Sequence, residues 1–320
     1  MPVVKAWPRI GIGCASLGSP DVAERDAEAT LAAAVEHGVR FFDVAPLYGG
    51  GLAEERLGRV LRHLPRDDYV LCTKAGVTRP YAEPPMPPGT TRPREHDAWD
   101  YGAAAIRRSV QTSLERLHVD RLDVVHLHDV EGREDAALEG HAALARLRDD
   151  GVVGAIGIGS NLVAPVVHLL ERAAFDAFLL AGRYTLLEQD GAALLADAHA
   201  RGIRTVAGGI FNSGVLAAWP QAAPTFAYRP ASAEVLERTG RIAAVCARHG
   251  VPIGAAALRF VVASRAVTTV LIGPRSVAEL ERNLEWLRME LPDALWTDLE
   301  ACGVMAAAAA RAAAPVSSLA

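Results

Sequence analysis

The sequence has 320 residues, of which 51% are hydrophobic and 22% charged, an ordinary composition for a globular protein and a sufficient length for one α/β barrel. Its formal net charge of −5 argues against a nucleic-acid partner. We find no signal-peptide pattern and no run of 18 apolar residues, so we expect a cytoplasmic protein that does not enter a membrane.

Strand-like and helix-like segments alternate along the chain. Short apolar runs predict strands at residues 10–15, 39–43, 69–74, 122–128, 152–159, 177–180, 203–207 and 267–272. Segments of helical periodicity predict helices at residues 22–37, 52–64, 101–117, 133–149, 162–173, 191–202, 233–249, 253–262, 276–287 and 294–305. Eight strands, each followed by a helix, predict a (β/α)8 TIM barrel that occupies residues 1–305 as a single domain.

Two segments stand outside this alternation. Residues 75–100 contain six prolines and are too long for a simple connection, so we predict a functional loop there. Residues 306–320 are alanine-rich and are expected to form a frayed tail. The alternative fold is an open doubly wound sheet. Gly11, Gly13 and Gly18, in and just after the first strand, lack the GxGxxG spacing of that fold's dinucleotide-binding turn and a following helix.

Four polar side chains are predicted to meet at the carboxyl ends of neighbouring strands. Asp43, Lys74 and His128 are each the last inward-facing residue of an otherwise apolar strand face, and Tyr48 lies on the glycine-rich loop after the second strand. A nearby ammonium lowers the pKa of a phenol from about 10. We therefore expect Tyr48 to act as general acid or base, with Asp43 holding Lys74 charged and His128 bonded to the substrate oxygen. His126, one pleat deeper, is interpreted as a satisfied core residue.

The later strands end in loops that suit a nucleotide. Residues 157–161 include two glycines and end in a hydroxyl and an amide, and residues 182–184 include an aromatic ring that can stack. Residues 208–214 and 273–276 are a glycine-rich turn and a helix start, both suited to phosphate. The four cysteines are far apart and no trio of ligands has metal spacing, so we expect buried free thiols and no bound metal.

Several motifs together resemble the aldo-keto reductase family between residues 10 and 287. They are FFDVAPLYGGG, LCTKAG, RSVQTSLERLHVDRLDVVHLHD, GIGSN, GRYTLLEQ, GGIFNSGVL and VLIGPRSVAELERN. The resemblance implies a barrel that binds NAD or NADP without a Rossmann fold, with Tyr48, Asp43, Lys74 and His128 in the roles given above. It also implies cofactor contacts at Ser160, Asn161, Tyr184, Phe211, Asn212, Ser213, Gly214, Leu216, Gly273, Arg275, Ser276, Glu279 and Asn283.

Within the family, the motifs are similar to those of the sugar-oxidising branch, the L-fucose and D-threo-aldose 1-dehydrogenases, with pyridoxal 4-dehydrogenase close by. This implies oxidation of an aldose such as L-fucose or D-arabinose at its anomeric carbon to the lactone, with Tyr48 as the base. Trp99 and Asp129 are expected to contact the substrate. Ala181 departs from the family pattern, because a glutamine that contacts the carboxamide usually stands there.

The cofactor preference and the reaction have open alternatives. Glu279 would repel a 2′-phosphate and favours NAD, whereas Arg275 close by favours NADP. The same chemistry would serve pyridoxal or another carbonyl substrate. Lys74 as a Schiff-base nucleophile is a further alternative, against which Asp43 argues by keeping the amine charged. The last alternative is a non-catalytic nucleotide sensor, against which the complete set of four residues argues. The sequence predicts no oligomeric state.

Overall fold

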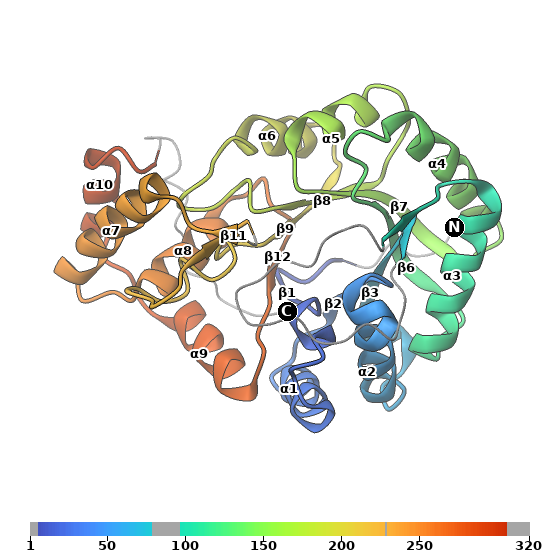
Figure 1. Cartoon of the computed structure of the whole chain (residues 1–320), viewed down its shortest axis with the longest axis horizontal. Helices are drawn as coiled ribbons and strands as arrows, with labels where there is room; N and C mark the ends of the chain where they lie inside the picture. The colour runs from blue at the N-terminus through green and yellow to red at the C-terminus, as the bar shows by residue number, and fades with distance from the viewer. Residues whose placement is uncertain (1–5, 79–96, 228, 306–320) are drawn as a thin grey trace.

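Eight parallel strands close into a barrel, and helices surround it (Figure 1). The computed structural model describes residues 6–78, 97–227 and 229–305. The predicted (β/α)8 fold is confirmed, with the strands in the order β1-β12-β9-β8-β7-β6-β3-β2 around the barrel. Their bounds are β1 Ile10–Gly13, β2 Phe41–Asp43, β3 Val70–Ala75, β6 Leu122–His128, β7 Val153–Ser160, β8 Ala177–Ala181, β9 Arg204–Gly208 and β12 Thr269–Ile272.

The helices match the predicted segments because each has an apolar face that is buried against neighbouring elements. They are α1 Glu24–Glu36, α2 Leu52–Leu61, α3 Ala103–Leu117, α4 Glu134–Asp149, α5 Val163–Leu170, α6 Ala192–Ala200, α7 Ala233–Arg248, α8 Ile253–Ala263, α9 Val277–Arg288 and α10 Asp293–Ala301. The end of α2 comes earlier than predicted, since the amides of His63 and Leu64 bond back three residues and tighten the chain.

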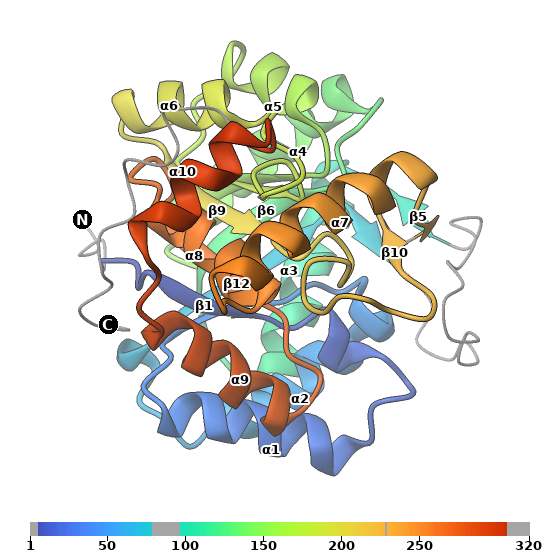
Figure 2. The same cartoon turned by 90° about the vertical axis from the view of Figure 1, so that its left-hand side faces the viewer.

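One side of the barrel carries an additional layer. There α8 contacts both α7 and α9, and α10 contacts α7 (Figure 2). None of the helices in the described ranges is by itself long and apolar enough to span a membrane. The pair α7 and α8, bent by 96°, meets that test by length and composition only.

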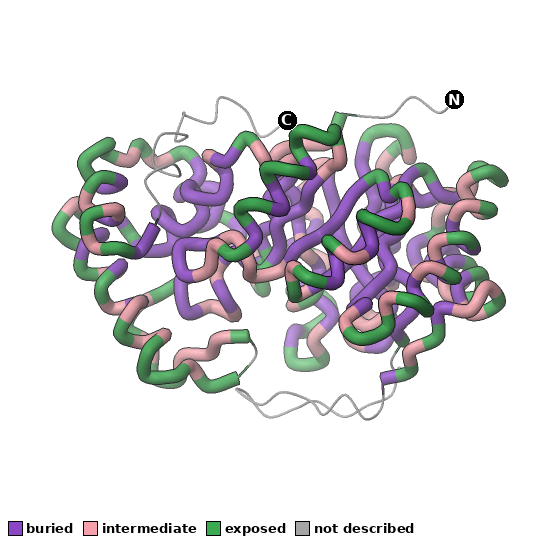
Figure 3. The backbone as a smooth tube through the Cα atoms, turned by 90° about the horizontal axis from the view of Figure 1, so that it is seen from above, coloured by how far each residue is buried: buried purple, intermediate pink, exposed green. Residues whose placement is uncertain are grey.

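Apolar side chains fill the inside of the barrel, so it is a packed core and not a pore. They are Phe41, Val70, Cys72, Val124, Ala155, Leu179, Val206 and Leu271. A second and larger core lies between the strands and the helices, and buried positions follow the strands and the inner sides of the helices (Figure 3). The polar residues at the carboxyl ends of β2, β3 and β6 therefore lie at one end of the barrel, next to this apolar interior.

Two short hairpins interrupt the connections between strands and helices. In the predicted loop 75–100, β4 Val77–Thr78 pairs antiparallel with β5 Ala98–Trp99, so the ends of this segment are strands and not irregular chain. The rest of that loop, and the predicted tail 306–320, lie outside the described residues. A second hairpin, β10 Thr225–Phe226 with β11 Arg229–Pro230, lies between β9 and α7 and was not predicted.

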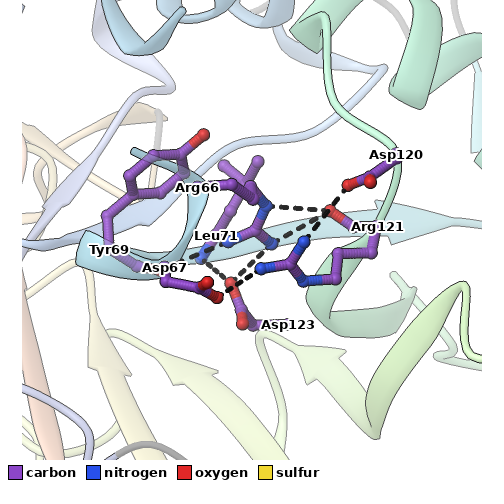
Figure 4. A network of polar contacts seen from close by, with 7 residues as sticks. All are labelled: Arg66, Asp67, Tyr69, Leu71, Asp120, Arg121 and Asp123. Carbon is purple, nitrogen blue, oxygen red and sulfur yellow. Dashed lines mark hydrogen bonds and ion pairs between the residues drawn. The ribbon is translucent and has the colours of Figure 1, made fainter. Parts of the chain in front are cut away.

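A polar network joins β3 and β6 at their amino ends, opposite the polar end described above (Figure 4). Oδ2 of Asp123 accepts hydrogen bonds from the backbone N–H of Leu71 at 2.8 Å and from Nη2 of Arg66 at 2.7 Å. Arg66 also donates to the carbonyl of Arg121 at 2.9 Å. The carboxylate thus holds the beginnings of two neighbouring strands together.

Candidate active site

The structure brings Asp43, Lys74 and His128 to one end of the barrel, because β2, β3 and β6 are neighbours there. The three side chains are almost fully buried, with residue exposures of 1%, 2% and 6%. Nζ of Lys74 donates to Oδ1 of Asp43 at 2.6 Å and to the carbonyl of Val44 at 2.9 Å. The ammonium is thereby fixed at the end of its strand by an acid from the next strand.

Tyr48 lies directly over this ion pair. Nζ of Lys74 is 4.7 Å from the centroid of the Tyr48 ring, and the His128 ring stands edge-on to the phenol at 6.0 Å between centroids. Tyr48 begins the short 3-10 turn η2 Tyr48–Gly51, in which Gly49 and Gly51 have φ of 65° and 106°. A side chain at Gly49 would overlap the carbonyl of Gly18, so the turn requires glycine for its conformation and for its close contact.

The electrostatics of the pair keep Lys74 charged. Burial by itself would lower the pKa of Lys74, but the charge of Asp43 and the interactions with Asp43 and Tyr48 outweigh it, and the pKa is raised. Burial also raises the pKa of Asp43, against the pull of the ammonium. An amine held protonated in this way is a poor nucleophile, which argues against the Schiff-base alternative.

His126 is buried as predicted, but it is not satisfied. Its residue exposure is 0%, and neither ring nitrogen has a hydrogen-bond partner among the described residues. Burial, followed by the charges of Lys74 and His128, lowers the pKa of His126 well below its usual 6.5, so the ring is neutral. The imidazole occupies the space next to Gly157 in which a side chain would collide with Nδ1. The prediction of a satisfied core histidine is therefore wrong in its hydrogen bonding.

Two carboxylates hold the residues that the resemblance assigns to the nicotinamide carboxamide. Oε1 of Glu131 accepts from Oγ of Ser160 at 2.9 Å and from the backbone N–H of Asn161 at 2.6 Å. Oδ1 of Asp129 accepts from Nδ2 of Asn161 at 3.0 Å. The predicted substrate residue Asp129 is 4% exposed and thus serves this corner as well.

The sequence reasoning missed Glu131. It lies three residues beyond His128 in HDVEG, and β6 pairs with β7 so that His128 lies beside Gly159. A carboxylate just past the end of β6 therefore faces Ser160, which ends β7. This position of Glu131 in the sequence could have indicated its role.

The aromatic and loop residues predicted for the cofactor have contacts within the protein. Tyr184 stacks on Phe260 of α8 at 5.2 Å with 28° between the rings, so one face of its ring is covered. Oδ1 of Asn212 accepts from Oγ1 of Thr185 at 2.6 Å, and Nδ2 donates to the carbonyl of Gly182 at 3.3 Å. The Asn212 side chain therefore joins the loops after β8 and β9, and its cofactor contact stays a prediction.

The remaining residues of the loop after β9 differ in exposure. Leu216 is fully buried in the outer core, so the structure does not present its side chain at the rim. Phe211 is half-buried and contacts Trp286 of α9 edge-on at 6.0 Å. The carbonyl of Ser213 accepts from Oγ1 of Thr225 at 2.9 Å, which ties the loop to the second hairpin, and Gly214 has φ of 98°.

The amino end of α9 is capped by the side chains of Ser276 and Glu279. Oγ of Ser276 accepts from the backbone N–H of Glu279 at 3.3 Å, and Oε2 of Glu279 accepts from the backbone N–H of Arg275 at 2.8 Å. Nη2 of Arg275 donates to Oδ2 of Asp21 at 2.5 Å. The guanidinium is thus already paired with an acid. The carbonyl of Gly273 accepts from Ser16 at 3.1 Å, and Asn283, one of the predicted contacts on α9, is 6% exposed.

The predicted substrate residue Trp99 lies on β5, where Cζ of Arg133 is 4.2 Å from the centroid of its ring. The contact joins the hairpin to the segment after β6, the strand that ends at His128. In the described part of the chain, no group of three His, Cys, Asp or Glu side chains is placed to hold a metal ion. The four cysteines have free thiols, and three of them are buried.

The model of the Aldo/keto reductase family matches residues 9–304. The chain is 39% identical over 310 residues to a D-threo-aldose 1-dehydrogenase of a Pseudomonas species, a match that covers 92% of this chain and 93% of that protein. It is 35% identical over 323 residues to the pyridoxal 4-dehydrogenase of Microbacterium luteolum, with coverage of 92% and 94%. Among solved structures, the holo form of aldo-keto reductase AKR11C1 from Bacillus halodurans has the same fold, with a TM-score of 0.74, 23% identity and coverage of 93% and 92%.

Proposed function

This chain belongs to the aldo/keto reductase family, and we propose that it oxidises an aldose at its anomeric carbon to the lactone. As a member of that family it is an oxidoreductase that uses a nicotinamide cofactor. The observation that carries the proposal is the Tyr48 phenol over a buried ammonium, which Asp43 fixes at 2.6 Å. The named relative that is 39% identical is an aldose 1-dehydrogenase, which supports a sugar as the substrate.

The four residues supply proton transfer. The phenolate of Tyr48 takes the proton of the anomeric hydroxyl as the carbonyl of the lactone forms. Lys74 stabilises the phenolate by its charge, and Asp43 keeps that charge in place. His128, edge-on to the phenol, binds the same sugar oxygen through a ring nitrogen. The nicotinamide that Ser160 and Asn161 would hold would supply the acceptor for the hydride released from the anomeric carbon.

The residues of the chain fit such a cofactor. The corner formed by Ser160 and Asn161 offers hydroxyl and amide groups that two carboxylates keep in place. The amino end of α9 presents backbone N–H groups suited to a phosphate. At that end Arg275 is already paired with Asp21, and Glu279 adds a second negative charge. We therefore favour NAD over NADP, because a 2′-phosphate would meet a neutralised arginine and a carboxylate.

A panel of substrates tests the proposal. The purified chain is assayed with L-fucose, D-arabinose, L-galactose and pyridoxal at mildly alkaline pH, each with NAD⁺ and with NADP⁺. We expect turnover of at least one aldose with NAD⁺. Tyr48→Phe should lower kcat by about 10²- to 10⁴-fold while cofactor binding, followed by protein fluorescence, is retained. Turnover of pyridoxal alone would overturn the substrate assignment, and full activity of the variant would overturn the role of Tyr48.

A further inference from the structure

The Glu54 carboxylate is fully buried, and it has no role in the proposed proton transfer. It lies in the first turn of α2, outside the barrel, with an exposure of 0%. Burying a carboxylate is costly unless hydrogen bonds and opposite charge satisfy it. Oε1 of Glu54 accepts from Oγ1 of Thr73 at 2.8 Å, and Oε2 accepts from Nη1 of Arg116 at 3.1 Å. The side chain thus joins three elements: α2, β3 and α3.

Of these elements, β3 carries Lys74, and α2 directly follows the turn that carries Tyr48. Thr73 immediately precedes Lys74 in β3, and because side chains alternate along a strand, Thr73 points outward while Lys74 points into the barrel. The turn that carries Tyr48 ends at Gly51, and α2 starts at the next residue. The hydrogen bond between Glu54 and Thr73 therefore connects α2, which follows the Tyr48 turn, with β3, which carries Lys74.

Arg116 also contacts the Tyr48 turn directly. A Cβ atom at Gly51 would overlap the guanidinium of Arg116, so this group lies against the backbone of the turn. Gly49 of the same turn is in contact with the carbonyl of Gly18. Both contacts hold the turn, and Glu54 fixes one of them by holding the guanidinium.

From these contacts we propose that Glu54 is a positioning residue: from outside the barrel, it sets the distance between the Tyr48 phenol and the Lys74 ammonium. The inference rests on the proposed function of these two residues. A misplaced phenol would lose part of the influence of the ammonium and be harder to ionise, so the rate of oxidation at a given pH would fall. An ion pair that only stabilised the fold would leave the pH dependence of the reaction unchanged.

The test compares Glu54→Gln and Thr73→Val with the wild type and with two controls. Thr73→Ser keeps the hydroxyl that binds Glu54. Asp123→Ala removes a carboxylate that also bonds to β3, at the amino end of that strand far from Tyr48. The substrate and cofactor that turn over in the panel above are used, and kcat is measured from pH 6 to 10.5 at a temperature at which all variants are folded.

We expect Glu54→Gln and Thr73→Val to lower kcat at pH 8 by about 10- to 100-fold and to move the midpoint of the pH profile upward. Thr73→Ser should resemble the wild type, and Asp123→Ala should lower the melting temperature with an unchanged midpoint. A Glu54→Gln enzyme with the wild-type kcat and midpoint would overturn the inference. If the wild type turns over no substrate in the panel, the proposed function fails. The positioning role is then decided by the ultraviolet titration of Tyr48 in the wild type and in Glu54→Gln, where identical midpoints would overturn it.

Discussion

At the level of single residues, the proposed chemistry depends on how the buried ion pair of Lys74 and Asp43 changes the ease with which the neighbouring Tyr48 phenol loses its proton. Lys74 is buried, and its pKa would fall without Asp43 and Tyr48, yet it is raised. Since a raised pKa keeps the ammonium charged up to and beyond its usual 10.5, the protonated Lys74 contributes its stabilisation in full below that value. That contribution is lost only when the pH rises through the raised value. The phenol therefore has a permanent positive neighbour at every pH at which the enzyme is expected to work.

Glu131 offers a prediction about the cofactor. Glu131→Ala removes the acceptor for Ser160 and for the backbone of Asn161, which leaves the corner without its brace. We expect the KM for the cofactor to rise about tenfold, since each net hydrogen bond is worth about 1 kcal/mol. Steady-state kinetics at saturating sugar measures the change.

The matched control for that prediction is Glu139→Ala, which removes an exposed glutamate from the following helix. This variant should have the KM of the wild type. Equal KM values for the cofactor in the two variants would contradict the role given to Glu131.

Sequence reasoning found the four convergent residues because strand alternation alone places Asp43, Lys74 and His128 at inward positions at the ends of their strands. It did not find Glu131 or Glu54. Both act through hydrogen bonds to residues 29 and 19 positions away in the chain. A long-range partner of this kind becomes visible only when the order of the strands and the register of the helices are known.

At the scale of elements, the long strands and helices followed from hydrophobic periodicity, whereas the two hairpins did not. Strands of two residues, such as β4 and β10, are too short to show a period of two. The left-handed turn at Tyr48 is a mixed case. Its three glycines predicted a break, but the contacts of Gly18 and Arg116 that require glycine there arise from the fold.

The hydrogen bonds of Asp123 form a brace between the amino ends of β3 and β6, and this brace gives a prediction about stability. Asp123→Ala leaves the backbone N–H of Leu71 without its side-chain acceptor and removes one of the acceptors of the Arg66 guanidinium. We expect the free energy of unfolding to fall by about 1–3 kcal/mol, as for a half-buried polar group that loses its partner. Urea denaturation measures this loss. Because the brace is at the amino end of the barrel, kcat should stay at the wild-type value.

Asp120→Ala is the control for the brace, since the Asp120 side chain is 83% exposed and pairs only with Arg121 among the interactions described. It should change the stability by less than about 0.5 kcal/mol. A comparable loss in both variants, or a lower kcat in Asp123→Ala, would show that the brace does not act as described.

At the scale of the whole molecule, the apolar filling of the barrel forces its polar chemistry to one end. The eight apolar residues of the interior were predictable in kind, because alternating strands must bury one face. His126 is the exception, a polar ring inside that core without hydrogen-bond partners among the described residues. The pattern of the strand gave no sign that this ring would be left unsatisfied.

The buried His126 makes the stability of the protein depend on pH. Its pKa is lowered in the fold, so below about pH 6.5 the unfolded chain binds a proton that the native state does not. This histidine should therefore cost about 1.4 kcal/mol of stability per pH unit as the pH falls below 6.5. His126→Leu should remove that part of the slope between pH 6.5 and 5 in urea denaturation. Parallel curves for the wild type and the variant would contradict the assignment.

The pKa of the Tyr48 phenol is the quantity on which the proposed proton transfer depends most. It can be measured by ultraviolet difference titration of tyrosinate absorbance, with the curve of Tyr48→Phe subtracted from that of the wild type. Because the Lys74 ammonium stays charged next to the ring, we expect a midpoint below the value of about 10 for a free phenol. A midpoint at 10 or above would show that the ammonium does not ease the loss of the proton, and would contradict the role proposed for Tyr48.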